Sequence, residues 1–421
     1  MIMASKEGTT PLIRVKNLYK VFGPNAGKVL QQVKDGQSKD DILAETGHTV
    51  GLNDINIDIY PGEIFVVMGL SGSGKSTLIR HFNRLIDPTE GMIEVEGSDV
   101  MSFDKEALQQ FRRHKMSMVF QRFGLMPHRT VLDNIGYGLQ IQGLAKHERE
   151  KQARYWLETV GLTGYEKHFP ASLSGGQQQR VGLARALCTD AEILLMDEAF
   201  SALDPLIRSE MQDQLIELQE KLHKTIVFIT HDLDEALRLG DRIAILRDGV
   251  LVQQGEPVDI LLNPADDYVE AFVKDVNRAR ALTVETVMKP QVFRISAETI
   301  GEALTEMRKS KDDYGYYINE EGYQGVITQE TLEGVESSEY DKAIDPSLLD
   351  NVPAVHTDSL LEAVIPETLD SEHPLPVINA DGDVEGRLSR STLAEVLSDQ
   401  AGTEEDDEKV KKLKASKSLA A

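Results

Sequence analysis

Residues 69–76 read Gly69-Leu70-Ser71-Gly72-Ser73-Gly74-Lys75-Ser76, and no other segment constrains this chain as strongly. The octapeptide follows an apolar run over residues 63–69 and precedes a helical pattern, so it is predicted to connect a buried strand to a helix. Its glycines leave backbone amides bare beside the helix N-terminus, and such amides cradle anions. Lys75 is predicted to reach the outer phosphates of a nucleoside triphosphate, and the Ser76 hydroxyl is predicted to meet Mg²⁺. The segment therefore predicts a triphosphate site but not its task.

A second glycine motif follows about 100 residues later as Leu173-Ser174-Gly175-Gly176-Gln177. Alone, Ser174-Gly175-Gly176 is as consistent with a mere turn and helix N-cap as with a phosphate-binding motif. Followed by Gln178-Gln179-Arg180 it is more specific. The two glycines leave bare amides at the start of a helix predicted to run to Cys188, which predicts a second surface that binds the γ-phosphate. A chain with two phosphate-binding surfaces implies ATP held between two copies.

An apolar run ends in two carboxylates at Ile193-Leu194-Leu195-Met196-Asp197-Glu198. This run predicts a buried strand whose acidic end lies at the carboxyl edge of a sheet, beside the phosphate loop. Asp197 is predicted to hold Mg²⁺, directly or through water, and Glu198 to polarise the attacking water. The alternative is an acidic pair that only caps a helix.

Composition limits the class of protein. With 421 residues the chain can form two or three domains, and its single cysteine, Cys188, excludes an internal disulfide, as expected in a reducing cytosol. No apolar stretch approaches the ~18 to 20 residues of a membrane span, and residues 1–10 lack a secretory apolar region. The net charge of -25 argues against general nucleic-acid binding.

The chain repeats itself from about Leu282, with an offset of 60 residues. Residues 291–304 resemble 351–364, and residues 317–322 resemble 377–382. Each unit is predicted to contain a short strand, a helix, a strand hairpin that turns at glycine, and another strand and helix. Residues 281–421 contain 30 acidic and 13 basic residues, so their net charge is -17 against -8 for the rest.

Before this boundary, the pattern alternates strands and helices, which predicts a parallel sheet with helices packed on it. A segment between the first two strands carries short helical pieces, one of them capped by Ser38. Asp248-Gly249 predicts a hairpin turn. The predicted segments are strands at 12–23, 63–69, 193–197 and 225–230, short helices within 29–46, and a helix at 146–160.

Taken together, the three motifs resemble those of ABC-type ATPases, and residues 10–280 resemble the ATP-binding subunit of osmoprotectant ABC importers, the glycine betaine/proline family. The resemblance rests on the phosphate loop, on the long insertion before it, and on residues 121–128 with Leu125-Met126-Pro127-His128. It also rests on residues 196–208, where Phe200 precedes the loop Ser201-Ala202-Leu203-Asp204. The repeat resembles a tandem CBS pair that opens at Val287-Met288-Lys289-Pro290.

This resemblance implies an α/β fold. An ABC-type P-loop NTPase cassette, with a RecA-like core plus antiparallel β and helical subdomains, is expected at 10–280, with a family-type insertion at 24–50. An α+β tandem CBS pair is expected to follow, with repeats at 282–340 and 341–400. Residues 401–421, an acidic run followed by five lysines, are expected to be a charged flexible tail.

The resemblance also assigns residues that a single sequence would leave as ordinary core or structural side chains. Phe22 matches the aromatic that stacks on adenine, Gln121 the metal-contacting glutamine, and His231 the switch histidine. The residues expected to be catalytic are Glu198, His231 and Lys75. The residues expected to bind nucleotide are Phe22, Gly69, Ser71, Gly72, Ser73, Gly74, Lys75, Ser76, Thr77, Gln121, Ser174, Gly175, Gly176, Gln177 and Asp204. The residues expected to bind metal are Ser76, Gln121 and Asp197.

The implied protein is a homodimeric ATPase that uses ATP and Mg²⁺ to drive import of an osmoprotectant such as glycine betaine or proline. The implied partners are a transmembrane permease subunit and an extracytoplasmic substrate-binding protein or domain, with no nucleic acid. The implied location is the cytoplasmic face of the inner (plasma) membrane, where the subunit is peripheral. The CBS pair is expected to regulate activity by binding cyclic di-AMP or another adenine nucleotide, or to serve only in dimerisation. Its acidity departs from the cationic face that docking on anionic lipid needs.

Other ABC-type proteins remain as alternatives. One alternative is the ATPase subunit of another amino-acid or amine importer. Importers of amino acids such as methionine share the cassette, but their usual C-terminal module is a ferredoxin-like domain and not a 60-residue tandem repeat. A soluble ABC ATPase that acts on ribosomes would usually carry two cassettes in one chain. An ABC ATPase that acts on DNA breaks would carry a long coiled-coil insertion. A nucleotide-sensing regulator without transport is disfavoured by Glu198 and His231, since a sensor needs no base to activate water.

Overall fold

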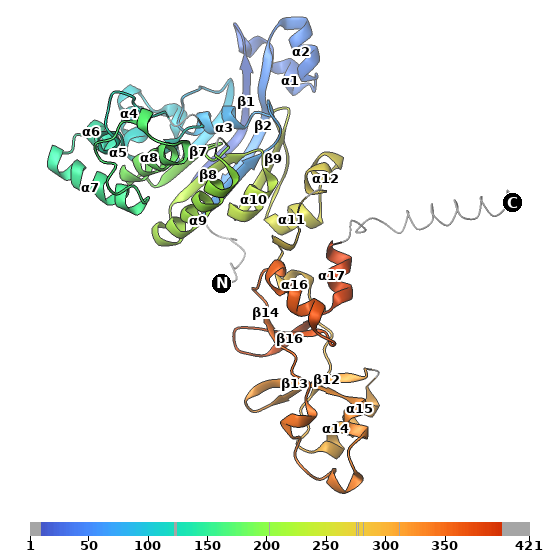
Figure 1. The fold of residues 1–421 in the computed structure, drawn as a ribbon. Helices are drawn as coiled ribbons and strands as arrows, with labels where there is room; N and C mark the ends of the chain where they lie inside the picture. The colour runs from blue at the N-terminus through green and yellow to red at the C-terminus, as the bar shows by residue number, and fades with distance from the viewer. Residues whose placement is uncertain are drawn as a thin grey trace, which may run out of the picture. The chain divides into compact units, whose positions relative to one another are not determined.

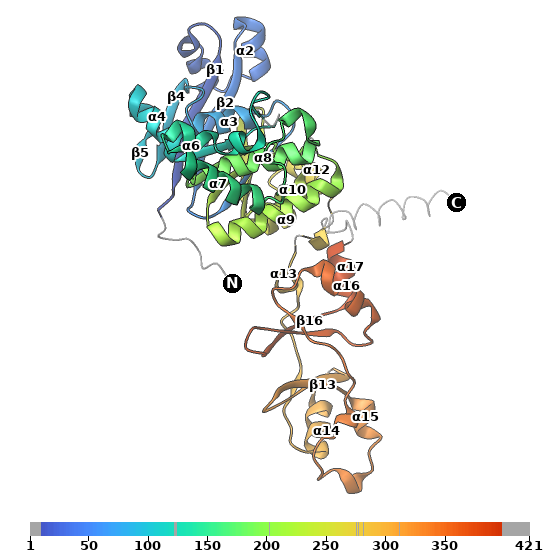
Figure 2. The same ribbon diagram turned by 60° about the vertical axis from the view of Figure 1, so that its left-hand side comes forward.

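The computed structural model describes residues 10–121, 124–201, 203–274, 276, 278–280, 282–310 and 312–397. The chain divides into two compact units between Val273 and Lys274. Figure 1 and Figure 2 show the strands and helices of each unit. The first unit carries the nucleotide motifs and the second carries the repeats.

A six-stranded sheet forms the centre of the first unit. In order across the sheet its strands are β10 (Val250–Gly255), β9 (Arg242–Arg247), β3 (Ile64–Met68), β8 (Thr225–Thr230), β7 (Ile193–Asp197) and β6 (Met116–Val119). Strand β10 is antiparallel to β9 and the other neighbours are parallel. Every residue of β3, β7 and β8 is buried, because helices and a core shared with the second sheet cover this sheet and leave no polar face. The predicted strands and the hairpin at Asp248-Gly249 are confirmed.

Helices pack on this sheet and gather at one end of it. Helix α3 contacts β7 and β8, α10 contacts β3, and α8 contacts β6. Helices α5, α6, α7 and α8 contact one another and form a helical subdomain (Figure 1). The helices of the first unit after the insertion are α3 (Lys75–Phe82), α4 (Lys105–His114), α5 (Val131–Ile135), α6 (Tyr137–Gln142), α7 (Lys146–Thr159), α8 (Gly175–Cys188), α9 (Pro205–Leu222), α10 (Leu233–Leu239), α11 (Pro257–Leu262) and α12 (Asp267–Val273). The helices predicted at 146–160 and up to Cys188 are confirmed.

A second, antiparallel sheet has the strand order β2-β1-β4-β5. Its strands are β1 (Ile13–Phe22), β2 (Thr49–Ile59), β4 (Glu90–Val95) and β5 (Ser98–Asp99). One hydrophobic cluster joins the two sheets, from Ile13 and Ile57 in this sheet to Phe65 and Ile229 in the central one. The two sheets therefore share one core.

The insertion is a long hairpin loop between β1 and β2, whose facing ends are Phe22 and Thr49. It contains α1 (Leu30–Lys34) and α2 (Lys39–Thr46), and the Ser38 side chain caps α2 by accepting a hydrogen bond from the Asp41 amide. The predicted short helices and their cap are confirmed. A small hydrophobic cluster that includes Val33, Ile42 and Val50 packs both helices against the strands, at the far end of the ladder (Figure 1).

The second unit repeats one arrangement of two parallel strands and a hairpin. The first repeat contains β11 (Arg294–Ile295), α14 (Ile300–Lys309), β12 (Tyr314–Asn319), β13 (Gly322–Thr328) and α15 (Gln329–Glu333). The second contains β14 (Val355–His356), α16 (Leu361–Asp370), β15 (Leu375–Ile378), β16 (Val384–Leu388) and α17 (Arg390–Leu397), and α13 (Val284–Val287) precedes both. The two three-stranded sheets have the orders β11-β12-β13 and β14-β15-β16. The short strand, the helix, the glycine hairpin and the final helix predicted for each repeat are confirmed. The further strand predicted after each hairpin is wrong for the described residues, since each sheet has three strands and the hairpin leads directly into the final helix.

Glycine closes both hairpins as predicted, since Gly322 and Gly382 have φ of 96° and 87°. The repeats contact each other: the Tyr316 hydroxyl donates to the Pro374 carbonyl over 2.9 Å, and Arg387 donates to the Tyr314 hydroxyl over 2.8 Å. The predicted tail at 401–421 lies outside the described residues. Among the helices in the described ranges, none has the length and apolar character that crossing a bilayer requires.

His81, on α3, makes the free energy of unfolding depend on pH. It is fully buried, its Nδ1 lies 2.7 Å from the Thr77 carbonyl, and its Nε2 has no hydrogen-bond partner among the described residues. Burial lowers its pKa from 6.5 to about 4. The unfolded chain therefore binds this proton at a higher pH than the folded one, so stability falls as pH drops through 6.5 toward 4, by about 3 kcal/mol in all.

Denaturant unfolding at several pH values between 7.5 and 4.5 measures this dependence. We expect His81→Leu to show a shallower loss of stability with falling pH than the unmodified protein. The exposed His147, changed to Gln, is the matched control and should leave the slope unchanged. Equal slopes for His81→Leu and the unmodified protein would contradict the assignment.

Candidate active site

The phosphate loop connects β3 to α3, and glycine is required at two of its positions. Gly69 and Gly74 have φ of 147° and 105°. A Cβ atom would lie 2.2 Å from the Leu246 carbonyl oxygen at Gly69 and 2.7 Å from the Gly51 carbonyl oxygen at Gly74. The loop can thus follow this path only without side chains there. The Gly249 amide donates to the Ser73 carbonyl over 2.9 Å and braces the loop from the β9–β10 turn.

Lys75 is buried at the start of α3 and directs its amine back into the loop. Its Nζ donates to the carbonyls of Gly69 and Leu70 over 2.7 and 3.0 Å. Burial lowers the pKa of Lys75, whereas the carboxylates of Glu198 and Asp197 partly oppose that shift. The loop therefore holds a poorly solvated cation, which an anionic phosphate would stabilise.

Asp197 ends β7 next to the phosphate loop, as the sequence predicts. Its side chain is buried, its Oδ1 accepts from the Ser76 hydroxyl over 2.9 Å, and its Oδ2 lies 3.5 Å from Arg80 Nη2. The parallel register of β3, β8 and β7 brings these residues together. A hydroxyl and a carboxylate beside a phosphate cradle fit Mg²⁺, which takes few protein oxygens and completes its shell with phosphate and water.

Glu198 has a left-handed backbone conformation that is unusual for its residue type, with φ of 45°. The Glu198 amide donates to the Ile229 carbonyl over 3.1 Å, and the Glu198 carbonyl accepts from the Ser201 hydroxyl over 2.9 Å. The Gln121 side chain donates to Glu198 Oε2 over 2.7 Å, and His231 Nδ1 lies 3.9 Å from Oε1. Gln121, Glu198 and His231 follow the neighbouring strands β6, β7 and β8, so the sheet edge holds this carboxylate between an amide and an imidazole.

A cavity of about 390 Å³ joins these groups to Phe22. It is lined by Phe22, Lys39, Thr49, Val50, Gly51, Ser71, Gly72, Ser73, Gly74, Lys75, Ser76, Thr77, Gln121 and Glu198. The Phe22 side chain is 39% exposed, and Lys20 Nζ lies 5.0 Å from its ring centroid. An aromatic ring and an anion cradle in one cavity fit a nucleoside triphosphate. Gly69, Asp197 and His231 are not among the residues that line the cavity.

The second glycine motif begins α8 but is not among the residues that line the cavity. Ser174 caps the helix reciprocally with Gln177: its hydroxyl accepts from the Gln177 amide over 3.3 Å, and the Gln177 side chain accepts from the Ser174 amide over 2.9 Å. Asp204 is exposed and caps α9, where it accepts from the Ile207 amide over 3.2 Å. Within one chain, Ser174, Gly175, Gly176, Gln177 and Asp204 thus lie apart from the cavity.

Comparison with known proteins decides the family. The model of the family described as ABC transporter matches residues 52–201. The glycine betaine/carnitine transport ATP-binding protein of Listeria monocytogenes is 46% identical over 393 residues, which cover 92% of this chain and 97% of that protein. The chain belongs to the ATP-binding subunits of betaine ABC transporters. The glycine betaine transport ATP-binding protein of Bacillus subtilis is 45% identical, over 91% of this chain and 92% of that protein.

Solved structures confirm the ABC cassette fold of this betaine-transporter subunit. One is a dimeric ATP-binding cassette in a post-hydrolysis state with ADP and Pi, which is 32% identical and covers 58% of this chain and 98% of that one with a TM-score of 0.50. The relatives are transport ATP-binding proteins over nearly their whole length, which favours transport over the regulator, ribosome and DNA-break alternatives.

In this betaine-transporter subunit, sequence reasoning missed one charged residue of the cavity, Lys39. It also missed Thr49, Val50 and Gly51, which the β1–β2 pairing places beside Phe22. One signal was available for Lys39: a lysine in the first turn of a helix opposes the helix dipole, so helix stability does not explain it.

Proposed function

We propose that the protein hydrolyses ATP to drive uptake of a quaternary-amine osmolyte, such as glycine betaine or proline, through separate membrane subunits. The proposal of ATP hydrolysis rests on the Glu198 carboxylate, which lies between Gln121 and His231 at a cavity lined by the phosphate loop. The osmolyte part is supported by relatives named for glycine betaine and carnitine in Listeria monocytogenes and for trimethylamine N-oxide in Ruegeria pomeroyi, the latter 51% identical over 273 residues.

Each residue of the site has a separate role in the proposed reaction. Phe22 stacks on the adenine, the amides of residues 71–77 bind the phosphates, and Lys75 neutralises their outer charge. Glu198 accepts the proton of the attacking water, while Gln121 and His231 orient the two carboxylate oxygens of Glu198. Ser76, Asp197 and Gln121 would hold Mg²⁺, which supplies charge stabilisation to the phosphates.

The active form proposed here is a homodimer. The amides of Gly175 and Gly176 and the Ser174 hydroxyl lie at the exposed start of α8, away from the chain's own cavity. They would contact the γ-phosphate of ATP bound by the other copy, and the Asp204 loop would cross between copies. The dimeric cassette with ADP and Pi supports this arrangement by likeness of fold.

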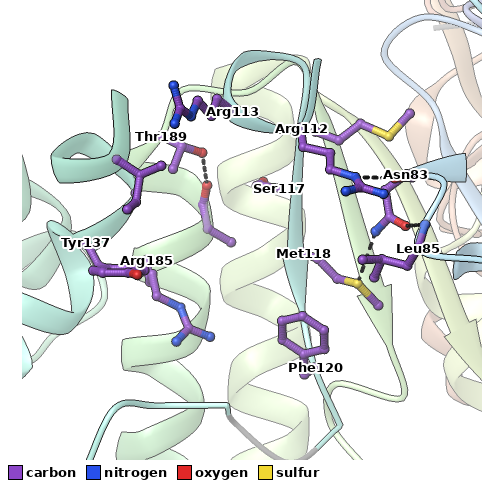
Figure 3. A pocket seen from close by; sticks show the side chains of 14 residues that line it. Asn83, Leu85, Arg112, Arg113, Ser117, Met118, Phe120, Tyr137, Arg185 and Thr189 are labelled. Atoms are coloured by element: carbon purple, nitrogen blue, oxygen red, sulfur yellow. Dashed lines mark hydrogen bonds between the residues drawn. The ribbon is translucent and has the colours of Figure 1, made fainter. Parts of the chain in front are cut away.

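A second cavity, of about 300 Å³, is the proposed docking site of a permease helix. It lies beside β6 and the helical subdomain (Figure 3), and its lining is mostly apolar, with Phe120 and Ile141 about 40% exposed. Arg112, Arg113 and Arg185 add positive charge. Phe120 directly precedes Gln121, so a helix seated here would be linked to the Glu198 carboxylate. Residues 121–128, which begin directly after Phe120, are proposed to transmit the closing and reopening of the dimer to this helix, and Arg122 and Phe123 lie outside the described residues.

Uptake of glycine betaine in proteoliposomes with the membrane subunits tests this function. We expect Ile141→Glu to lower ATP-driven uptake by roughly tenfold, because it places a charge in the apolar docking surface, while ATP binding by the isolated subunit is unchanged. Leu262→Glu is the matched control, since Leu262 is similarly exposed on α11 and does not line this cavity. Equal uptake by the two variants would refute docking at this cavity, and no ATP-driven uptake by the unmodified protein would refute the transport function.

The second unit is proposed to be a CBS pair that regulates transport, with cyclic di-AMP or another adenine nucleotide as ligand. Support comes from its internal repeat and from the direct contacts between the repeats at Tyr316 and Arg387. A regulator must bind its ligand with different affinity in active and resting states. Residues 281–421 have a net charge of -17, so anionic lipid repels them within a Debye length of ~8 Å at physiological salt. Added salt weakens that repulsion.

Removing residues 274–421 should therefore leave the basal ATPase activity of the first unit and abolish inhibition by nucleotide or by low ionic strength. The measurement is ATP-driven uptake across a salt series, with and without cyclic di-AMP, in membranes that contain anionic lipid. Identical salt and nucleotide responses of both proteins would leave the second unit a structural or dimerising role only.

A further inference from the structure

Lys39, on the insertion between β1 and β2, brings a second cation to the rim of the nucleotide cavity. It is the first residue of α2 and lines the cavity together with Phe22 and the phosphate loop. Its Nζ lies 3.5 Å from the Gly72 carbonyl oxygen and 3.7 Å from Asp248 Oδ1. We propose that Lys39 is a second phosphate-binding lysine of the ATP site, an inference that rests on the ATPase function proposed above.

The position of Lys39 is fixed by the fold of the insertion. Val33 and Ile42 anchor α1 and α2 in a buried cluster against the strands, and Ser38 caps α2 just before Lys39. The insertion therefore presents this side chain to the phosphate loop from a rigid base. Its flexible four-carbon stem allows the amine to move within the cavity.

The present partners of Lys39 do not account for its position. The Asp248 side chain is 68% exposed. It also has a second cationic neighbour, because Arg247 Nε lies 3.9 Å from its Oδ2. A surface ion pair of this geometry contributes little to stability, so exchanging Asp248 for a phosphate oxygen costs little. The β9–β10 turn does not need Lys39 to brace the loop either, because the Gly249 amide already donates to the Ser73 carbonyl over 2.9 Å.

The charges that line the cavity explain why a second lysine would bind phosphate there. Lys75 is the other lysine among the residues that line the cavity, and the Glu198 carboxylate lines it as well. A triphosphate brings several negative charges to this site, and an ammonium group at the rim strengthens its binding through charge-assisted hydrogen bonds. A contact of this kind acts on the phosphates and not on the transferred proton, so it affects affinity more than turnover.

The test measures the Kd of Mg·ATP for the full chain by titration calorimetry. Lys39→Gln should raise this Kd about fivefold with kcat within about twofold of the unmodified protein, whereas Lys39→Arg should keep the Kd within about twofold. Lys28→Gln is the matched control, since Lys28 is exposed on the same insertion and does not line the cavity. An unchanged Kd for Lys39→Gln, or an equal effect of Lys28→Gln, would overturn the proposal.

Two further variants separate the possible failures. If Lys39 only braced the turn through Asp248, Asp248→Asn would raise the Kd as much as Lys39→Gln does; the proposal requires Asp248→Asn to leave the Kd unchanged or to lower it. Lys75→Ala reports on the ATP site itself. If Lys75→Ala weakens ATP binding and Lys39→Gln does not, only the role of Lys39 fails; if Lys75→Ala has no effect, the proposed ATP site fails.

Discussion

Glu198→Gln should abolish steady-state ATP hydrolysis and leave ATP binding intact. The change removes the charge that accepts a proton from water but keeps the shape of the side chain and its place between Gln121 and His231. General-base catalysis supplies roughly 10²- to 10⁴-fold, so kcat should fall by at least about 100-fold. Because hydrolysis is what would reopen the dimer, the variant should also accumulate as an ATP-bound dimer on size-exclusion chromatography.

Glu217→Gln is the matched control for charge removal, because Glu217 is an exposed glutamate on α9 with only a 3.9 Å contact to Lys221. It should hydrolyse ATP at the unmodified rate. Turnover by Glu198→Gln within about twofold of that rate would show that another group activates the water.

Mixing two inactive chains should restore activity if the site is shared between copies. Lys75→Ala removes the cation of the phosphate loop, and Ser174→Arg fills the exposed start of α8 that would face the other copy's ATP. Neither homodimer should support transport or hydrolysis. A heterodimer of the two has one wholly unmutated site and one doubly damaged site, so the mixture should hydrolyse ATP in a single-turnover assay.

The Ser174→Arg variant also loses a helix cap, which costs about 1 kcal/mol. Ser174→Asp separates stability from contact, because aspartate caps helices equally well but repels phosphate. It should fold with unmodified stability and still be inactive alone. Full activity of Ser174→Arg or Lys75→Ala on its own would rule out the composite site.

The sequence predicted those parts of the site whose chemistry requires a particular residue at a particular backbone position. Gly69 and Gly74 are required by positive φ and by approaching carbonyls, and Asp197 follows from a buried strand that ends at the sheet edge. Ser174 caps α8, as the interpretation of its motif as a helix N-cap predicted. The repeat offset likewise predicted both glycine hairpins of the second unit.

Contacts that depend on how distant segments pack could not be predicted in this way. The Gln121–Glu198 hydrogen bond joins residues 77 positions apart and exists because β6 and β7 are neighbours. The cavity beside β6 is lined by residues between Asn83 and Thr189, so no local pattern marks it. Lys39 reaches the phosphate loop only after the insertion folds onto the sheet.

The insertion starts and ends at one point of the fold. Phe22 and Thr49 are paired across the ladder, and His48 Nε2 lies 2.8 Å from the Pro24 carbonyl oxygen. A loop whose ends already meet can change length at little entropic cost, about 0.6 kcal/mol for each doubling. The length of the segment can thus change between two fixed strand ends, but a replacement must still cover Val21 and Val50, which the insertion buries. If Lys39 binds phosphate as proposed, grafting this one loop would change nucleotide affinity separately from the strands and motifs that carry out the chemistry.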